Sequence, residues 1–193
     1  MNNLLGLVGK DIEYSLSPFL HEVSAKILQR NFSSYQIFSV PCAEDLRVFL
    51  KESWLKGALG FNITSPWKEE LAKIFSFESG GVNTLYRDGS SGWQVASTDA
   101  LGLQKALELW QKSFLGFDKI CFLGGGGVVV SILSYLEVLG FGGEVIVHCR
   151  CPQKQKSLKE KYKTLNLTLR SWDENSFVLT SSQLGALSLL IQA

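Results

Sequence analysis

The fold class of this chain rests on one stretch of sequence, Lys119-Ile120-Cys121-Phe122-Leu123-Gly124-Gly125-Gly126-Gly127-Val128. Its apolar first half predicts a buried strand, and its four glycines predict a tight turn. Apolar positions then recur with helical spacing up to residue 139, and residues 144–148 predict a second strand. A strand, a glycine turn, a helix and a second strand together form the first unit of a parallel, Rossmann-like sheet.

The glycine turn predicts a site for the phosphates of a dinucleotide, at the positive end of the following helix. Arg150 comes 21 positions after Val129, at the end of the second strand, where an NAD-binding protein carries an acid. A guanidinium suits a 2′-phosphate, so we expect NADP. Val129 stands where glycine or alanine is usual, which predicts a wider spacing between helix and strand. The predicted cofactor-binding residues are Gly124, Gly125, Gly126, Gly127, Val128 and Arg150. Alternatively, the glycines form a packing turn and Arg150 is a solvated strand end.

The N-terminal half predicts a second α/β arrangement. Apolar or alternating runs at 4–9, 35–40 and 59–64 predict strands, and 82–87 with 93–97 predict a hairpin. Helices are expected over 43–51 and 101–112, and after two Ser-Pro pairs, Ser17-Pro18 and Ser65-Pro66. In each pair we expect the serine to cap the helix and the proline to occupy its first turn. Leu20 and Ile27 belong to the apolar face expected of the first such helix.

Polar residues that could bind a small substrate lie at the ends of these strands. Ser15 and Ser17 put two hydroxyls at a helix N-terminus, which suits a carboxylate, although Ser17 could serve only as a cap. Further candidates are Asn62, Thr64, Lys68, Asn83 and Asp99. Asn62 and Thr64 are two apart and so point to the same side of an extended chain. A lysine in the first helical turn is disfavoured by the positive end of the helix dipole, which indicates a functional role for Lys68.

In this order, the segments resemble the shikimate dehydrogenase family over most of the chain. The matching segments are Ser15-Leu16-Ser17-Pro18, Asn62-Ile63-Thr64-Ser65-Pro66-Trp67-Lys68, Gly81-Val82-Asn83-Thr84, Ser97-Thr98-Asp99-Ala100, residues 124–128, and Cys149-Arg150-Cys151. Ser97 and Ala100 replace an asparagine and a glycine of the family pattern, and two cysteines flank Arg150 where asparagine and threonine are usual. The resemblance implies an NADP-dependent oxidoreductase that interconverts 3-dehydroshikimate and shikimate in aromatic amino-acid biosynthesis.

The resemblance also implies a role for each residue. Ser15 and Ser17 would hold the substrate carboxylate, and Asn62, Thr64, Asn83 and Asp99 its ring hydroxyls, with Lys68 and Asp99 as the catalytic pair. A developing alkoxide needs a nearby cation or proton donor, which a lysine beside a carboxylate supplies. The alternative is a non-catalytic relative that binds a shikimate-like acid or a partner chain.

The C-terminal end permits two interpretations. Residues 185–193 resemble a late family helix whose glutamine touches substrate, which would make Gln192 a substrate ligand and return this last helix to the substrate domain. Alternatively, residues 179–185 are a degenerate form of the family's Asn-Ala-Thr strand and turn, and the chain stops early. The expected fold is α/β: a mixed-sheet substrate domain over 1–113, then an abbreviated Rossmann-like NADP-binding domain over 114–193.

The bulk composition limits the partners. Lysine and arginine number 19 against 18 acids, so a net charge of +1 gives no electrostatic reason to expect nucleic acid or an anionic membrane. The uncharged stretch 122–136 is shorter than the ~20 residues of a membrane span. The four cysteines lack the spacing of a metal site or a disulfide framework, which predicts no metal and reduced thiols in the cytoplasm. We expect a monomer or homodimer with a small-molecule substrate.

Overall fold

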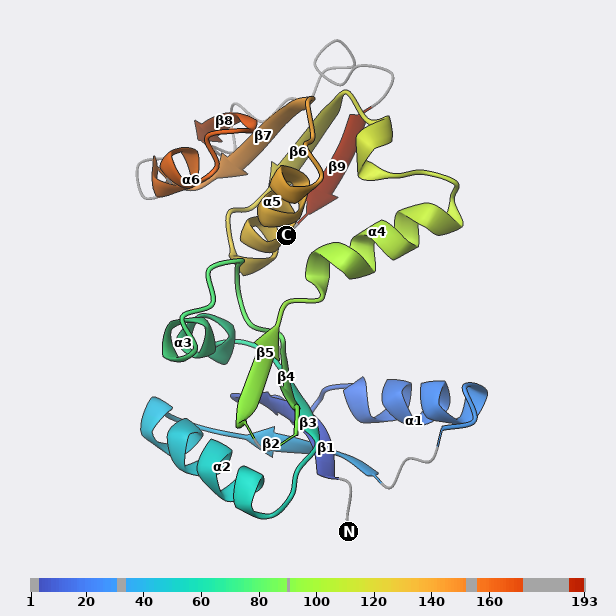
Figure 1. The fold of residues 1–193 in the computed structure, drawn as a ribbon, viewed down its shortest axis with the longest axis vertical. Coiled ribbons are helices and arrows are strands. Elements are labelled where there is room, and N and C mark those ends of the chain that lie inside the picture. Colours follow the sequence, from blue (N-terminus) through green and yellow to red (C-terminus); the bar gives the residue numbers. More distant parts are fainter. Residues whose placement is uncertain (1–3, 31–33, 90, 152–155, 172–187, 193) are drawn as a thin grey trace. The chain divides into compact units, whose positions relative to one another are not determined.

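The structure is a computed structural model, and it describes residues 4–30, 34–89, 91–151, 156–171 and 188–192. Contacts divide the chain into two compact units, Met1–Ser97 and Thr98–Ala193. In the first unit the elements are β1 (Leu4–Gly9), α1 (Ser17–Ile27), β2 (Ser34–Ser39), α2 (Ala43–Leu55), β3 (Gly60–Ile63), α3 (Trp67–Ile74), β4 (Thr84–Arg87) and β5 (Trp93–Ala96) (Figure 1). In the second they are α4 (Asp99–Leu109), a 3₁₀ turn (Phe114–Gly116), β6 (Lys119–Leu123), α5 (Gly127–Val138), β7 (Glu144–Cys149), α6 (Lys156–Lys161), β8 (Asn166–Ser171) and β9 (Ser188–Gln192).

The first unit is built on a five-stranded mixed sheet with strand order β2-β1-β3-β4-β5. β1 pairs in parallel with both β2 and β3, whereas β4 pairs antiparallel with β3 and with β5. The predicted strands and the predicted hairpin are therefore confirmed. Because β4 reverses direction and β5 reverses it again, the start of β4 and the end of β5 lie at the same edge as the ends of β1 and β3.

The two faces of this sheet differ in how they are covered. Helices α2 and α3 lie on one side of it and α1 on the other (Figure 1). The face toward α2 and α3 carries the main core, in which Val8, Leu46, Leu71 and Leu85 are fully buried. The opposite face carries a smaller cluster of buried residues, Leu7, Ile12 and Tyr35. Most of the hydrophobic stabilisation of this unit therefore comes from the α2/α3 side.

The first helix and the starts of two helices differ from the sequence prediction. α1 has no buried residue, and Leu20 and Ile27 of its expected apolar face are 59% and 74% exposed. Ser17 is already helical and makes no capping hydrogen bond; instead its amide donates to Ser15 Oγ at 3.2 Å. Pro66 precedes α3 instead of occupying its first turn, and the Ser65–Pro66 peptide is cis. The predicted serine caps were therefore wrong, because neither α1 nor α3 begins with a side-chain capping hydrogen bond.

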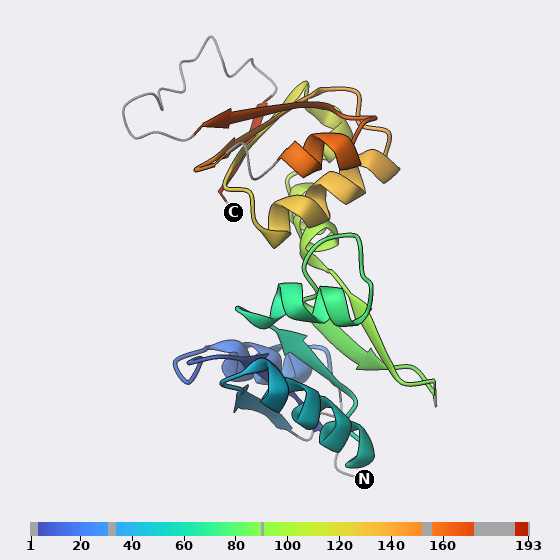
Figure 2. The same ribbon diagram turned by 90° about the vertical axis from the view of Figure 1, so that its left-hand side faces the viewer.

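The second unit contains a four-stranded sheet with strand order β8-β7-β6-β9, and all its strands are parallel. Its buried cluster joins one sheet face, including Phe122 and Val147, to Ala100 and Leu107 of α4 and to Ile132 and other residues of α5. Figure 2 shows α5 and α6 on the same face of the sheet. The prediction of a Rossmann-like unit is confirmed, because β6, the glycine turn, α5 and β7 follow one another as expected.

The end of the chain corrects a second prediction. Residues 188–192 form β9, which pairs in parallel with β6 from Lys119↔Ser188 to Leu123↔Gln192. The predicted last helix is therefore a strand, and it belongs to the second unit instead of returning to the first. Gln192 lies at the carboxyl end of that strand, so the helix that was to present it to a substrate is absent from the described residues. The alternative segment 179–185 lies outside the residues that the structure describes.

The division of the chain bears on the expected domain boundary. The contacts group α4 with the second unit, through Ala100 and Leu107 in the core of that unit. The sequence instead predicts that the substrate domain extends to residue 113. Packing units and functional domains need not end at the same residue, and the boundary between 113 and 114 stays a prediction.

Candidate active site and cofactor-binding turn

The predicted substrate residues of the first unit gather at one edge of its sheet. The amide of Thr64, just after β3, donates to the carbonyl of Val8 near the end of β1, at 2.9 Å. Asn83, just before β4, accepts from the amide of Ile63 at 2.8 Å and donates its own amide to the carbonyl of Ala96 at 3.1 Å. The ends of β1, β3 and β5 are thus joined side by side by main-chain hydrogen bonds.

Lys68 is held at this edge by its main chain. It lies in the first turn of α3, and its carbonyl accepts a hydrogen bond from the amide of Val82 at 3.0 Å. That bond fixes the first turn of α3 to the segment that leads directly into Asn83. The side chain of Lys68 is half-buried, and that of Asn83 is 8% exposed. A half-buried lysine at this edge can bind and polarise a hydroxyl.

Ser15 and Ser17 form a hydroxyl pair at the start of α1. Ser15 Oγ donates to Ser17 Oγ at 3.1 Å, and both residues are half-buried. The amide of Ser15 donates to the carbonyl of Ile12 at 3.0 Å, which shapes the loop between β1 and α1. Because this loop leaves the carboxyl end of β1, the pair comes from the same edge as Thr64. Two hydroxyls at the start of a helix suit an anionic oxygen.

Asn62 lies in a network that the sequence did not predict. Tyr35 donates its hydroxyl to Asn62 Oδ1 at 2.7 Å, and the ring of His21 stacks on that of Tyr35 with centroids 4.0 Å apart. Burial lowers the pKa of His21, and a hydrogen bond with Asn62 partly opposes that shift. Burial also raises the pKa of Tyr35, which keeps its hydroxyl protonated as a donor. The sequence predicts Tyr35 only as a strand residue, and it carries no local signal that would pair Tyr35 with Asn62.

Two predicted site residues belong to the second unit. Asp99 is the first residue of α4 and is half-buried, and Gln192 ends β9 with an exposed side chain. Ser15, Thr64 and Lys68 thus belong to the first unit, whereas Asp99 and Gln192 belong to the second. The catalytic pairing of Lys68 with Asp99 and the substrate contact of Gln192 stay predictions.

The glycine turn of the second unit has the form of a phosphate site. Gly124 has φ of 126°, a conformation that favours glycine, and its amide donates to the carbonyl of His148 in β7 at 2.9 Å. α5 starts at Gly127 with no side-chain cap, and a Cβ added to Gly126 would meet nothing within 4 Å. Open space in front of uncapped helical amides fits a pyrophosphate.

The flanking residues are also compatible with NADP. Arg150 follows β7 directly and is exposed, so its guanidinium is accessible to a 2′-phosphate. Val129 is fully buried and belongs to the core of the second unit. The valine that stands where glycine or alanine is usual is therefore accommodated by packing. Residues 124–128 and Arg150 are thus the groups that would hold the cofactor.

The described residues contain neither a membrane-spanning helix nor a group of side chains arranged to hold a metal ion. No helix in the described ranges is long and apolar enough to span a membrane. Within the same part of the chain, no three His, Cys, Asp or Glu side chains are grouped to hold a metal ion. The four cysteines, all of which are described, are free thiols.

Comparison with known proteins finds similarity to shikimate dehydrogenases. Residues 7–85 match the family model described as the shikimate dehydrogenase substrate binding domain. A shikimate dehydrogenase (NADP(+)) of Crocosphaera subtropica is 31% identical over 191 residues, which cover 94% of this chain and 65% of that protein. The chain is thus a relative of the shikimate dehydrogenases. The match at 7–85 covers the edge on which Ser15, Thr64, Lys68 and Asn83 lie.

Further members of the shikimate dehydrogenase family agree in sequence and fold. A shikimate dehydrogenase (NADP(+)) of Clostridium perfringens is 36% identical over 183 residues, 89% of this chain and 62% of that protein. The shikimate 5-dehydrogenase of Thermus thermophilus, solved in complex with NADP(H) and shikimate, has a TM-score of 0.75 at 23% identity over 98% of this chain and 77% of that one. The chain thus spans less than two thirds of the length of the two curated relatives.

Proposed function

We propose that this protein is an NADP-dependent oxidoreductase that interconverts 3-dehydroshikimate and shikimate, a step of aromatic amino-acid biosynthesis. One observation carries the proposal. The residues that the family pattern assigns to the substrate, among them Ser15, Thr64, Lys68 and Asn83, come from three separate segments and converge on one edge of one sheet. Capping or core packing would not require three segments to bring polar side chains to the same edge.

The chemistry at this edge follows from the groups present. The hydroxyl pair of Ser15 and Ser17 is suited to hold the substrate carboxylate, which fixes one end of a rigid ring. Asn83 and Thr64 are suited to bind ring hydroxyls, with Asn62 held in place by Tyr35. Lys68 would accept or return the proton of the reacting hydroxyl, with Asp99 as its carboxylate partner. NADP, when bound, supplies the hydride acceptor.

The cofactor assignment rests on the second unit. Gly126 leaves space before the first turn of α5, and Arg150 offers a cation at the end of the adjacent strand. The shikimate dehydrogenases of Crocosphaera subtropica and Clostridium perfringens carry NADP(+) in their names. We therefore assign the phosphate-binding role to residues 124–128 and preference for the 2′-phosphate to Arg150.

The cellular setting and assembly follow from the same properties. Four free thiols fit a reducing compartment such as the cytoplasm. A net charge of +1 offers no attraction for nucleic acid. We propose a monomer or homodimer that acts on a small molecule.

The test separates binding from turnover. Formation of NADPH is followed at 340 nm with shikimate and NADP, and each ligand is titrated alone by calorimetry. We expect turnover, binding of each ligand, and loss of NADP binding in Gly126→Val with shikimate binding retained, because the new side chain enters the open space before α5. Shikimate binding without NADP binding or turnover would instead support the non-catalytic relative.

A further inference from the structure

A second pocket lies in the first unit, between α2, the end of α3 and the start of β5. Its volume is about 360 Å³, within the range of small-molecule sites. Most of its lining is apolar, from Leu50, Trp54, Leu55, Ile74, Phe75 and Trp93. We call the sheet edge that carries Ser15, Thr64, Lys68 and Asn83 the candidate substrate edge. None of its residues lines this pocket.

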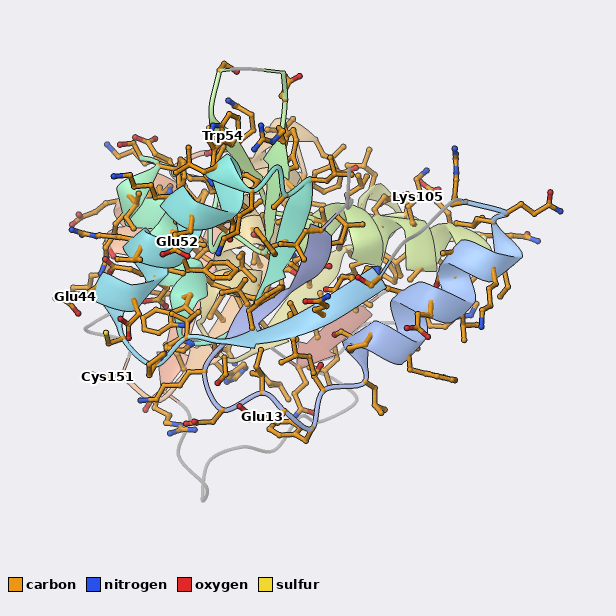
Figure 3. The ribbon with its side chains drawn as sticks, turned by 90° about the horizontal axis from the view of Figure 1, so that it is seen from below. Glu13, Glu44, Glu52, Trp54, Lys105 and Cys151 are labelled. Carbon is orange, nitrogen blue, oxygen red and sulfur yellow. The ribbon has the colours of Figure 1, made fainter. Side chains whose placement is uncertain are left out.

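The pocket lies at the opposite end of the sheet from the candidate substrate edge. β5 runs from Trp93 to Ala96, and it is Ala96 that hydrogen-bonds Asn83 at that edge. Trp93 is therefore at the far end of the strand, beside the hairpin tip. Figure 3 shows Trp54 of α2 next to this hairpin. A ligand bound here would leave the substrate edge open.

Two tryptophans form a rigid aromatic wall. The rings of Trp54 and Trp93 meet edge to face, with centroids 5.3 Å apart. Trp93 donates its indole N–H to the carbonyl of Leu50 at 3.0 Å. The guanidinium of Arg87 lies 3.6 Å from the centre of the Trp54 ring and donates to the carbonyls of Ala58 and Trp54. These contacts fix the ring orientations, which suits recognition of another flat apolar group.

The charged side chains that line the pocket are all positive in the described residues. Arg47 and Lys51 line it, one helical turn apart on α2, and the described lining includes no acidic side chain. Arg47 is only loosely paired, with Glu70 at 3.8 Å, and it remains 68% exposed. Lys51 is exposed and forms no ion pair with the part of the chain that the structure describes. A ligand with a negative group near its apolar body would meet both cations.

We propose that this pocket is a binding site for a planar aromatic carboxylate, separate from the substrate edge. The aromatic ring would pack against Trp54, Trp93 and Phe75, and the carboxylate would lie between Arg47 and Lys51. The volume suits a single ring with a short acidic side chain. The proposal is independent of the dehydrogenase activity, since no residue that lines this pocket has a part in it.

The test uses 3-phenylpropanoate and its neutral analogue 3-phenylpropanamide, each titrated into the full chain by ligand-detected NMR and by tryptophan fluorescence. We expect saturable binding of the acid with a Kd on the order of 1 mM, given its size, and weaker binding of the amide. Lys51→Gln should weaken binding of the acid roughly two- to fivefold without changing that of the amide, and Lys51→Arg should restore it. Ile74→Trp should fill the pocket and remove binding of both.

Matched controls make the proposal falsifiable. Lys56→Gln removes an exposed lysine of the same region that pairs with Glu52 and does not line the pocket, so it should leave binding unchanged. Equal affinity for acid and amide would overturn the assignment, as would displacement of the acid by shikimate or weaker binding in Lys68→Ala. Sedimentation gives a further outcome. If the wild type is a dimer and Ile74→Trp dissociates it, the pocket binds a second copy of the chain and the proposal is overturned.

Discussion

The two units present their candidate sites with different parts of the polypeptide. In the first unit the site is made of side chains that come from three segments and meet at the edge of a mixed sheet. In the second it is made mainly of backbone, from one uninterrupted strand, turn and helix. The difference teaches that a side-chain site depends on the tertiary fold for its geometry, whereas a backbone site depends on glycines at a few local positions.

Removal of Lys68 should have the largest effect. Lys68→Ala is expected to lower kcat roughly 10²–10⁴-fold, because the reacting hydroxyl loses its proton acceptor, while NADP binding to the second unit stays unchanged. Steady-state NADPH formation and a cofactor titration measure the two quantities. Lys73→Ala, an exposed position on the same helix, is the control. A loss of less than tenfold would deny Lys68 the proton-transfer role.

A substitution at Arg150 should affect the second unit alone. Arg150→Gln removes the charge expected to bind the 2′-phosphate, so kcat/KM for NADP should fall about 10–100-fold, with little change for NAD. Comparing the two cofactors in the same assay gives the selectivity directly. Lys163 is an exposed cation elsewhere in this unit, and Lys163→Gln should leave the ratio of kcat/KM for NADP to that for NAD unchanged. An equal fall in kcat/KM for both cofactors would show that Arg150 does not recognise the 2′-phosphate.

A matched pair of tyrosines tests whether the polar network of the first unit supports its site. Tyr35 donates to Asn62 at 2.7 Å, and Tyr162 of the second unit lies 2.8 Å from Ser134 Oγ. Each Tyr→Phe change should lower the free energy of unfolding by about 0.5–1.5 kcal/mol, measured by urea denaturation. Only Tyr35→Phe should also weaken shikimate binding, because Asn62 loses its fixed orientation. If both variants bind shikimate as the wild type does, Tyr35 has a purely structural role.

Acidification should have the smallest effect and should act on both units. The chain has two histidines, His21 and His148, one in each unit, and burial lowers the pKa of each in the folded protein. Between the lowered pKa and the unfolded value of about 6.5, the unfolded chain binds more protons, so stability falls as the pH drops below about 6.5. Urea midpoints at pH 7.5 and 5.5 should therefore differ more in wild type than in a variant with both histidines changed to asparagine. Equal differences would exclude the histidines as the cause.

Local sequence was sufficient for the elements whose signals are contiguous. β6, the glycine turn and α5 were predicted because an apolar run, positive-φ glycine and helical spacing act within a few residues. The hairpin of β4 and β5 was predicted for the same reason. The helix predicted over 185–193 failed because Ser188-Leu189-Leu190-Ile191-Gln192 is short and apolar, a pattern that does not separate a helix from a buried strand. Its pairing with β6, distant in sequence, makes it a strand.

By itself, then, the sequence determined the α/β class, the NADP-type turn, and which polar residues could serve a shikimate dehydrogenase. Tertiary structure alone decided that Thr64 and Asn83 adjoin at one sheet edge, that Tyr35 holds Asn62, and that Gln192 ends a strand. The physical reason is that turn and helix signals arise from neighbouring residues, whereas hydrogen bonds between strands join residues whose separation along the chain carries no local pattern.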